Sequence, residues 1–225
     1  AFVVQAAFLL RVEETVTPQP GVLKTLKPTL FVPLRARGTL WLVLPADIAA
    51  WALGGFFLSL APSLLAVATG STSVINGGLA VAALTISGAI SILNLRLRAP
   101  QLALLVGCSF LAVGVSVTLL SVNLGWLWLF FTGAVVAGIG FGASFLGALR
   151  LLLPLAHAHE RAGLMSAFLA LSYLAFCVPS LIAGLAVKTE GLIVTANVYG
   201  STVVVLALFA LTGLLVQRAG KTDAA

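Results

Sequence analysis

A carboxylate lies inside a long apolar segment of this chain. Asp47 is the one charged residue in the run Trp41–Ala68, and Trp51 follows it one helical turn later. A charge at such a depth costs about 2.5–3.5 kcal/mol, so an acid in hydrocarbon is a functional candidate by default. We expect Asp47 to exchange a proton or to pair with a cationic substrate. The alternative is that it faces cytosolic water or pairs with Arg98 or Arg150.

Aromatic and hydroxyl side chains extend this candidate site. The aromatic candidates are Trp51, Phe56, Phe57 and Tyr173. Such rings could line a site for a bulky apolar or cationic ligand, the latter through cation–π interactions. The alternative is that they pack inside the protein or lie at the membrane interface. The predicted substrate or proton pathway comprises Asp47, Trp51, Ser59, Ser144 and Tyr173.

Other chemistries have little support in the sequence. His157 and His159 stand two positions apart without further ligands beside them, which makes a poor metal site. The series Gly138-x-Gly140-x-x-Ala143 matches a dinucleotide fingerprint, but that fingerprint requires a preceding strand, and here the apolar run continues past it. There is no Ser/His/Asp arrangement, Walker loop or pair of intramembrane carboxylates. We therefore expect no enzyme, catalytic residue, metal or cofactor.

Six apolar segments must position these residues. Each has at least about 20 residues, enough for a helix to cross roughly 30 Å of hydrocarbon. Backbone groups in lipid need partners within the protein, so such segments form helices. Hydrophobic residues make up 61% of the chain and charged residues 8%, against about 25% charged in soluble domains. We predict an all-α polytopic membrane protein with spans at Trp41–Ala68, Asn76–Leu95, Pro100–Leu120, Leu127–Leu149, Ala162–Val187 and Leu192–Val216.

The basic residues fall at alternate ends of these spans. Of the 12 Lys and Arg residues, Lys188 alone belongs to the other side. The positive-inside rule therefore predicts a cytosolic C-terminus in a multi-pass protein of the inner (plasma) membrane. This distribution excludes nucleic acid as the partner of the net charge of +6 and leaves the lipid bilayer.

Small residues and prolines within the spans predict close packing or gating. Gly54, Gly55, Gly138 and Gly142 would let helices approach closely. Pro62 and Pro179 would each remove a backbone hydrogen bond and kink a helix, either as a gate that bends or as a static kink.

The first 40 residues precede the six-span bundle. Residues 1–10 are apolar but too short to cross a bilayer, and we interpret them as the end of a truncated transmembrane helix. Residues 11–40 are rich in proline and basic side chains, which predicts a cytosolic linker. The bundle then occupies residues 41–218, and residues 219–225 form a cytosolic tail.

The order of these parts resembles the C-terminal half of a major facilitator superfamily transporter, of a bacterial drug-efflux-type branch. The local signatures are Trp51–Leu64, Gly138–Phe145, Glu160-Arg161-Ala162, Ser172-Tyr173 and Pro179. One departure is the segment Leu95–Pro100, which keeps only the arginines of the family's loop. The resemblance implies two inverted three-helix repeats, with the first and fourth spans lining the pathway and the third and sixth facing lipid.

The function implied by this resemblance is secondary active transport. The chain would be one wall of a transporter that moves a small organic solute or drug by alternating access, with proton coupling. Its partners would be this small-molecule substrate and a missing N-terminal bundle. The alternative is a non-transporting membrane scaffold or assembly subunit, in which Asp47→Asn would leave the activity unchanged.

Overall fold

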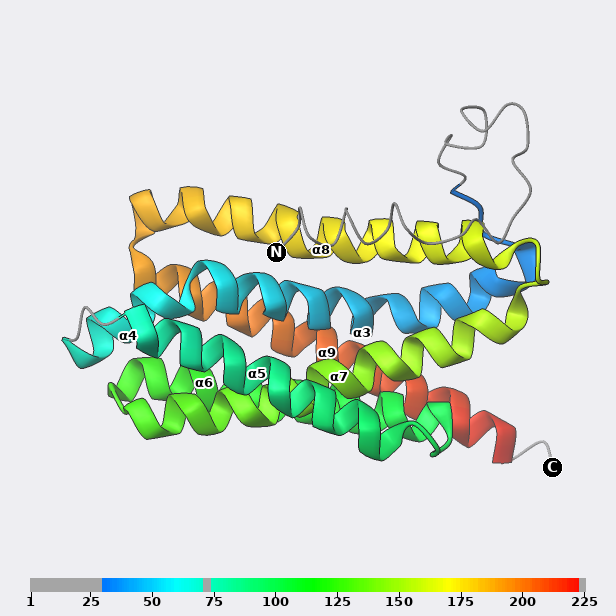
Figure 1. Cartoon of the computed structure of the whole chain (residues 1–225), viewed down its shortest axis with the longest axis horizontal. Helices are drawn as coiled ribbons and strands as arrows, with labels where there is room; N and C mark the ends of the chain where they lie inside the picture. Colours follow the sequence, from blue (N-terminus) through cyan, green and yellow to red (C-terminus); the bar gives the residue numbers. More distant parts are fainter. Residues whose placement is uncertain (1–29, 71–73, 223–225) are drawn as a thin grey trace, which may run out of the picture.

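Long helices packed side by side make up the described part of the protein. The computed structural model describes residues 30–70 and 74–222, and Figure 1 shows the helices extending along one common direction. Six of them are long and apolar enough to cross a membrane, and the described residues contain no strand, which confirms the predicted all-α polytopic fold. The helices are α3 (Leu34–Ser59), α4 (Ala61–Thr69), α5 (Val74–Leu95), α6 (Pro100–Leu124), α7 (Leu127–Leu152), the 3-10 helix η1 (Leu153–Leu155), α8 (Arg161–Glu190) and α9 (Leu192–Thr222).

The first span starts earlier than its apolar run suggested. Helix α3 begins at Leu34 rather than Trp41, directly after Pro33, whose ψ of 142° is extended. The length of the apolar run could not reveal this start, because the first turn of α3 carries Arg35 and Arg37. A membrane helix can continue beyond the hydrocarbon where its charged side chains reach water. Residues 34–40, which the prediction assigned to the linker, are therefore helical.

The same span is interrupted near its other end. Leu60 separates α3 from α4, with φ −106° and ψ −33°. Pro62 lies in the first turn of α4. A proline there cannot donate to the carbonyl of Leu58, and its ring clashes with that carbonyl, so the interruption follows from the predicted proline effect. Pro179 differs, since α8 continues through it without a break.

Two other predicted boundaries concern the ends of the chain. The interpretations of residues 1–10 and 11–29 lie outside the described residues. At the other end, α9 continues to Thr222, so the predicted tail from residue 219 is helical at its start.

Glycines at intervals of seven residues join α6 to α7. Gly133, Gly140 and Gly147 share one face of α7, because seven residues make close to two helical turns. A Cβ at Gly147 would come within 2.6 Å of the Leu104 backbone nitrogen, and a Cβ at Gly133 within 2.7 Å of the Thr118 backbone nitrogen. The two backbones therefore approach closely, as small residues allow in membranes.

The predicted packing glycines of α7 lie on another face of that helix. A Cβ at Gly138 would meet Ser87 Oγ and the Leu84 carbonyl of α5, and one at Gly142 would meet the Gly88 backbone. Helix α7 thus packs through glycine against α5 on one side and α6 on the other. These positions place Gly138 and Gly142 in a helix contact.

The six spans differ in how far the rest of the chain buries them. The apolar window of α6 is 50% buried, whereas those of α5 and α8 are 22% buried. Other helices of this chain therefore cover about half of the α6 window, and the expectation that the third span also faces lipid stays a prediction. The glycine contacts with α7 explain its burial, and a reciprocal amide pair between Asn123 and Asn197 (2.9 and 3.1 Å) joins its end to α9.

The connections alternate between the two ends of the bundle. In Figure 1 the start of α3, the α5–α6 turn, the α7–α8 loop and the end of α9 lie at one end, and the α6–α7 and α8–α9 turns lie at the other. We call the first the arginine-rich end, because the described arginines lie there, near helix ends or in the α5–α6 turn: Arg35, Arg37, Arg96, Arg98, Arg150, Arg161 and Arg218. The predicted grouping of basic loops at one end is thus present in the fold.

Candidate functional site

Asp47 is completely buried and joined to a second helix. Its side chain has no exposed surface, and Ser172 Oγ of α8 lies 2.8 Å from Asp47 Oδ2. The same Ser172 hydroxyl lies 2.9 Å from the carbonyl oxygen of Phe168. Asp47 Oδ1 has no hydrogen-bond partner among the described residues. The carboxyl is therefore anchored on one side and unpaired on the other.

The structure shows Asp47 away from the ends of its helix and without an ion pair to Arg98 or Arg150. Because α3 starts at Leu34, Asp47 stands near the middle of this 26-residue helix. Arg150 directs its guanidinium to the carbonyl oxygens of Arg98 (2.7 Å) and Leu95 (3.3 Å). The alternative that Asp47 faces water or pairs with Arg98 or Arg150 is wrong: it is buried and forms no ion pair with either.

Trp51 is the centre of an aromatic cluster beside this carboxyl. Its ring centroid lies 5.2 Å from Tyr173 and 5.9 Å from Phe145, with Phe141 at 6.2 Å and Phe176 at 6.3 Å. All four contacts are edge-to-face, the arrangement that aromatic quadrupoles favour. The cluster is assembled from α3, α7 and α8. Tyr173 is 57% exposed, so the cluster reaches the surface of the bundle there.

Phe56 and Phe57 belong to the core rather than to a ligand site. Their exposed fractions are 1% and 0%, and they contact Tyr199 and Phe130 respectively. The packing alternative therefore holds for these two rings.

The two predicted serines lie apart from this contact network. Ser59 is exposed at the end of α3 and donates to the carbonyl of Gly55 (2.7 Å). Ser144 is buried between α6 and α7, where a Cβ on Gly107 would meet its backbone and hydroxyl. The structure thus brings Asp47, Trp51 and Tyr173 together, but not Ser59 or Ser144.

The paired glycines of α3 lie where that helix meets α8. A Cβ on Gly55 would come within 2.7 Å of the carbonyl oxygen of Phe176 and would also meet Ser180. A Cβ on Gly54 would touch the Phe176 ring at 3.4 Å. These positions serve close packing directly beneath the aromatic cluster.

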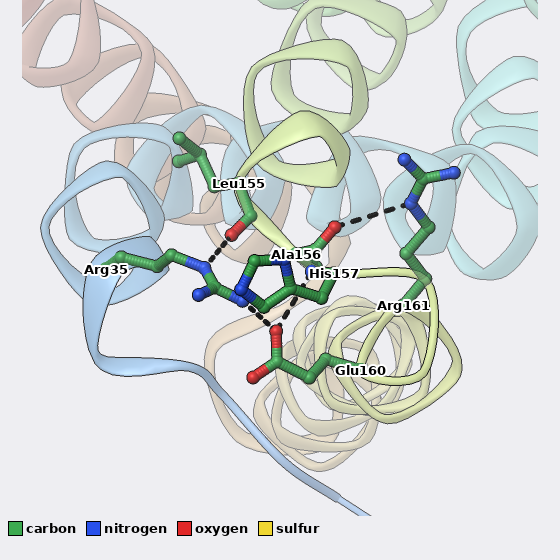
Figure 2. A network of polar contacts seen from close by, with 6 residues as sticks. All are labelled: Arg35, Leu155, Ala156, His157, Glu160 and Arg161. Atoms are coloured by element: carbon green, nitrogen blue, oxygen red, sulfur yellow. Dashed lines mark hydrogen bonds and ion pairs between the residues drawn. The ribbon is translucent and has the colours of Figure 1, made fainter.

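A polar network closes the arginine-rich end of the same helices. Figure 2 shows Arg35 of α3 donating to the Leu155 carbonyl and forming an ion pair with Glu160. Glu160 also accepts from the backbone N–H of His157 (2.9 Å). The backbone N–H of Phe31 donates to the Gly163 carbonyl at 3.3 Å. The start of α3 is therefore fastened to the α7–α8 loop.

The charge of Glu160 is stabilised by this network. The hydrogen bond from His157, together with the positive charge of Arg35, lowers the pKa of the Glu160 carboxyl. The rings of His157 and His159 stack with centroids 5.8 Å apart. The described residues contain no group of three His, Cys, Asp or Glu side chains that could hold a metal.

Sequence reasoning did not identify several members of the site. Ser172, Phe141 and Phe145 were visible only as members of local signatures, and Phe176 had no distinguishing signal in its apolar segment. Their proximity to Trp51 depends on how α7 and α8 pack against α3. Helical periodicity alone does not specify which helices are neighbours.

Comparison with known proteins adds no relative. No protein-family model matches the chain, and no curated protein matches it. The fold itself defines the class of protein, a multi-pass helical membrane protein with a buried acid beside an aromatic cluster.

Proposed function

We propose that this chain forms one wall of a secondary active transporter that moves a small organic solute or drug by alternating access, with proton coupling through Asp47. The observation that supports this most is the Asp47–Ser172 contact beside Trp51, built from the middle of the helices. Transporters place substrate and coupling sites near the bilayer midplane, between helical units. At this position the Asp47 carboxyl can change its charge by taking up and releasing a proton.

The hydroxyl of Ser172 supports proton binding at this carboxyl. A serine has one hydroxyl proton, yet Ser172 Oγ lies within hydrogen-bond distance of both Asp47 Oδ2 and the Phe168 carbonyl. Donation to Phe168 leaves the hydroxyl as an acceptor, and only a protonated Asp47 can then donate to it. Donation to Asp47 instead suits the carboxylate. The hydrogen bond between Asp47 of α3 and Ser172 of α8 therefore has a different donor in each protonation state: Asp47 when it is protonated, and Ser172 when it is ionised.

The aromatic cluster supports an organic ligand. Trp51 and Tyr173 present ring surface close to an unpaired carboxyl oxygen, and a cation on such rings gains about 0.5–2 kcal/mol. A protonated amine or quaternary ammonium compound fits both features. We propose that the exposed side of Tyr173 faces a second helical bundle, the N-terminal half of the same transporter, so that the ligand is enclosed between the two.

The test is proton-driven transport by the protein that contains this chain. Inverted membrane vesicles would be energised with a pH gradient, with ethidium as the cationic aromatic probe and an internal pH dye as the second readout. Asp47→Asn keeps the side-chain volume but cannot take up a proton. We expect it to reduce proton-coupled ethidium transport at least about tenfold, the effect of losing roughly 1.4 kcal/mol of coupling.

Ser91→Ala is the matched control, because Ser91 is also a buried polar residue with an unpaired side-chain atom but lies on α5, outside the predicted pathway. It should leave transport close to that of the unchanged protein. Equal transport by Asp47→Asn, or a protein that never moves the probe or protons, would contradict the proposal and favour the scaffold alternative.

A further inference from the structure

A second site lies on the other side of α8. An apolar groove of about 300 Å³ lies between α3, α8 and α9. Its floor is formed by buried side chains, among them Ala183 (3% exposed) and Val203 (1% exposed). Its rim carries exposed Ile182 and Val198. The groove is therefore a depression along the surface of the bundle, with its long side open to the surroundings.

The groove has one charged end and one apolar end. Glu190, the one charged residue that lines it, lies at the last position of α8, away from the arginine-rich end. Along α9 the lining extends from Val194 to Leu206, about 18 Å at 1.5 Å per residue. One leaflet of hydrocarbon is about 15 Å deep, half of the full core. The groove thus reaches from the membrane surface to about the midplane.

The groove does not face the proposed partner bundle. Ile182 on its rim and Tyr173 of the aromatic cluster are nine residues apart on α8. At 3.6 residues per turn this spacing puts them on opposite faces of the helix. The rim therefore faces the bilayer even when Tyr173 faces protein. Water in the groove would find few hydrogen-bond partners along its apolar walls. The acyl chains of the surrounding lipid therefore fill the groove instead.

We propose that this groove binds a phospholipid with an ammonium headgroup, of the phosphatidylethanolamine type. One acyl chain lies against Ala183, Ala186 and Val203, and its length matches the depth of a leaflet. The ammonium group forms an ion pair with Glu190 at the mouth. An anionic phospholipid without an amine places only negative charge beside this carboxylate and binds more weakly. The site is separate from Asp47 and is independent of the transport proposal.

The experiment is lipid retention by the purified, delipidated protein. Equimolar phosphatidylethanolamine and phosphatidylglycerol with identical acyl chains are added, and bound lipids are counted by native mass spectrometry. We expect the unchanged protein to prefer the ethanolamine lipid about two- to fivefold, the range of a partly exposed ion pair. Glu190→Gln should bring the ratio close to one and keep the bound chain. Ala186→Trp fills the groove and should abolish retention of both lipids.

Two controls keep the result interpretable. Leu185→Trp introduces the same side chain at the neighbouring exposed position, outside the groove lining, and should retain both lipids. If Ala186→Trp unfolds in detergent, Ala186→Leu replaces it and should lower retention partially. An unchanged headgroup ratio in Glu190→Gln, or full retention in a folded groove-filled variant, overturns the proposal. A photocrosslinker at position 186 that captures a protein segment instead of lipid also overturns it.

Discussion

Unpaired polar atoms mark the site at the scale of single residues. Among the described residues, four buried side-chain atoms have no hydrogen-bond partner, and two of them are Asp47 Oδ1 and Trp51 Nε1. Leaving a buried polar group unpaired costs about 1–3 kcal/mol. The acceptor Asp47 Oδ1 and the donor Trp51 Nε1 stand one helical turn apart on α3, and the Trp51 side chain is one of the groups that interact with the Asp47 carboxyl. The other two are Ser91 Oγ and Ser144 Oγ, and the Cys108 thiol of α6 interacts with Ser144.

Two glycines of α3 should respond in opposite ways to alanine. A Cβ at Gly38 meets nothing within 4 Å, so Gly38→Ala should stabilise the protein by about 0.5–1 kcal/mol through lower backbone entropy of the unfolded chain. Gly55→Ala should destabilise it by about 1–3 kcal/mol, because its Cβ would press on the Phe176 backbone. Thermal unfolding of both variants in the same detergent measures this. Equal melting temperatures would mean that α3 and α8 are not in close contact at Gly55.

At the scale of elements, two kinds of contact hold the bundle together. Backbones approach through glycine where α7 meets α5 and α6. Polar contacts act at the ends instead, where Asn123 pairs with Asn197 and Arg35 pairs with Glu160. The hydrophobic effect does not drive helices together in lipid, because lipid chains are as apolar as the helix surfaces. Helix association depends instead on close packing and hydrogen bonds.

The fastening of α3 to the α7–α8 loop should depend on pH. The pKa of Glu160 is lowered in the folded protein, so its contribution is present above the ordinary carboxyl pKa and is lost as the pH falls through the lowered value. Glu160→Gln should therefore speed amide hydrogen exchange of the α7–α8 loop at neutral pH. The unchanged protein should exchange equally fast only at acidic pH, after correction for intrinsic rates.

Arg37→Gln is the control for this experiment. Arg37 lies on the same helix end but contacts the carbonyl of Val32 within its own segment (3.5 Å). It should leave the loop's exchange unchanged. If Glu160→Gln and Arg37→Gln behave alike, the ion pair does not hold the loop.

At the scale of the whole molecule, charge distinguishes the two ends of the bundle. The described arginines lie at one end of the bundle, whereas Lys188 and Glu190 lie at the end of α8 that points the other way. Positively charged loops are retained on the cytosolic side during insertion. The fold therefore supplies a definite expectation for which end faces the cytosol.

Reporter fusions test this orientation. A fusion after residue 225 should be active as a cytosolic green fluorescent protein and inactive as an alkaline phosphatase. A fusion in the α6–α7 turn at Gly125 should show the reverse. Phosphatase activity at the C-terminus would invert the whole arrangement and remove the cytosolic assignment of the arginine-rich end.

Much of the fold was accessible from the sequence. The length and apolarity of the six segments predicted the helices, since lipid leaves the backbone no other way to satisfy its hydrogen bonds. Pro62 predicted the interruption near Leu60, because a missing N–H is a local property. The predicted start of α3 was wrong, because the length of an apolar run does not show where a helix continues past the hydrocarbon.

The sequence alone determined that Asp47 and Trp51 share one helix face, because both stand on a single continuous helix and are four residues apart. Only the tertiary structure decided that Ser172 binds the carboxyl and that Tyr173 completes the aromatic cluster while Phe56 and Phe57 are core. The physical reason is that uniformly apolar helices carry almost no directional signal along their faces. Close packing at Gly55 instead brings α8 against α3. Packing of this kind depends on the arrangement of the whole bundle.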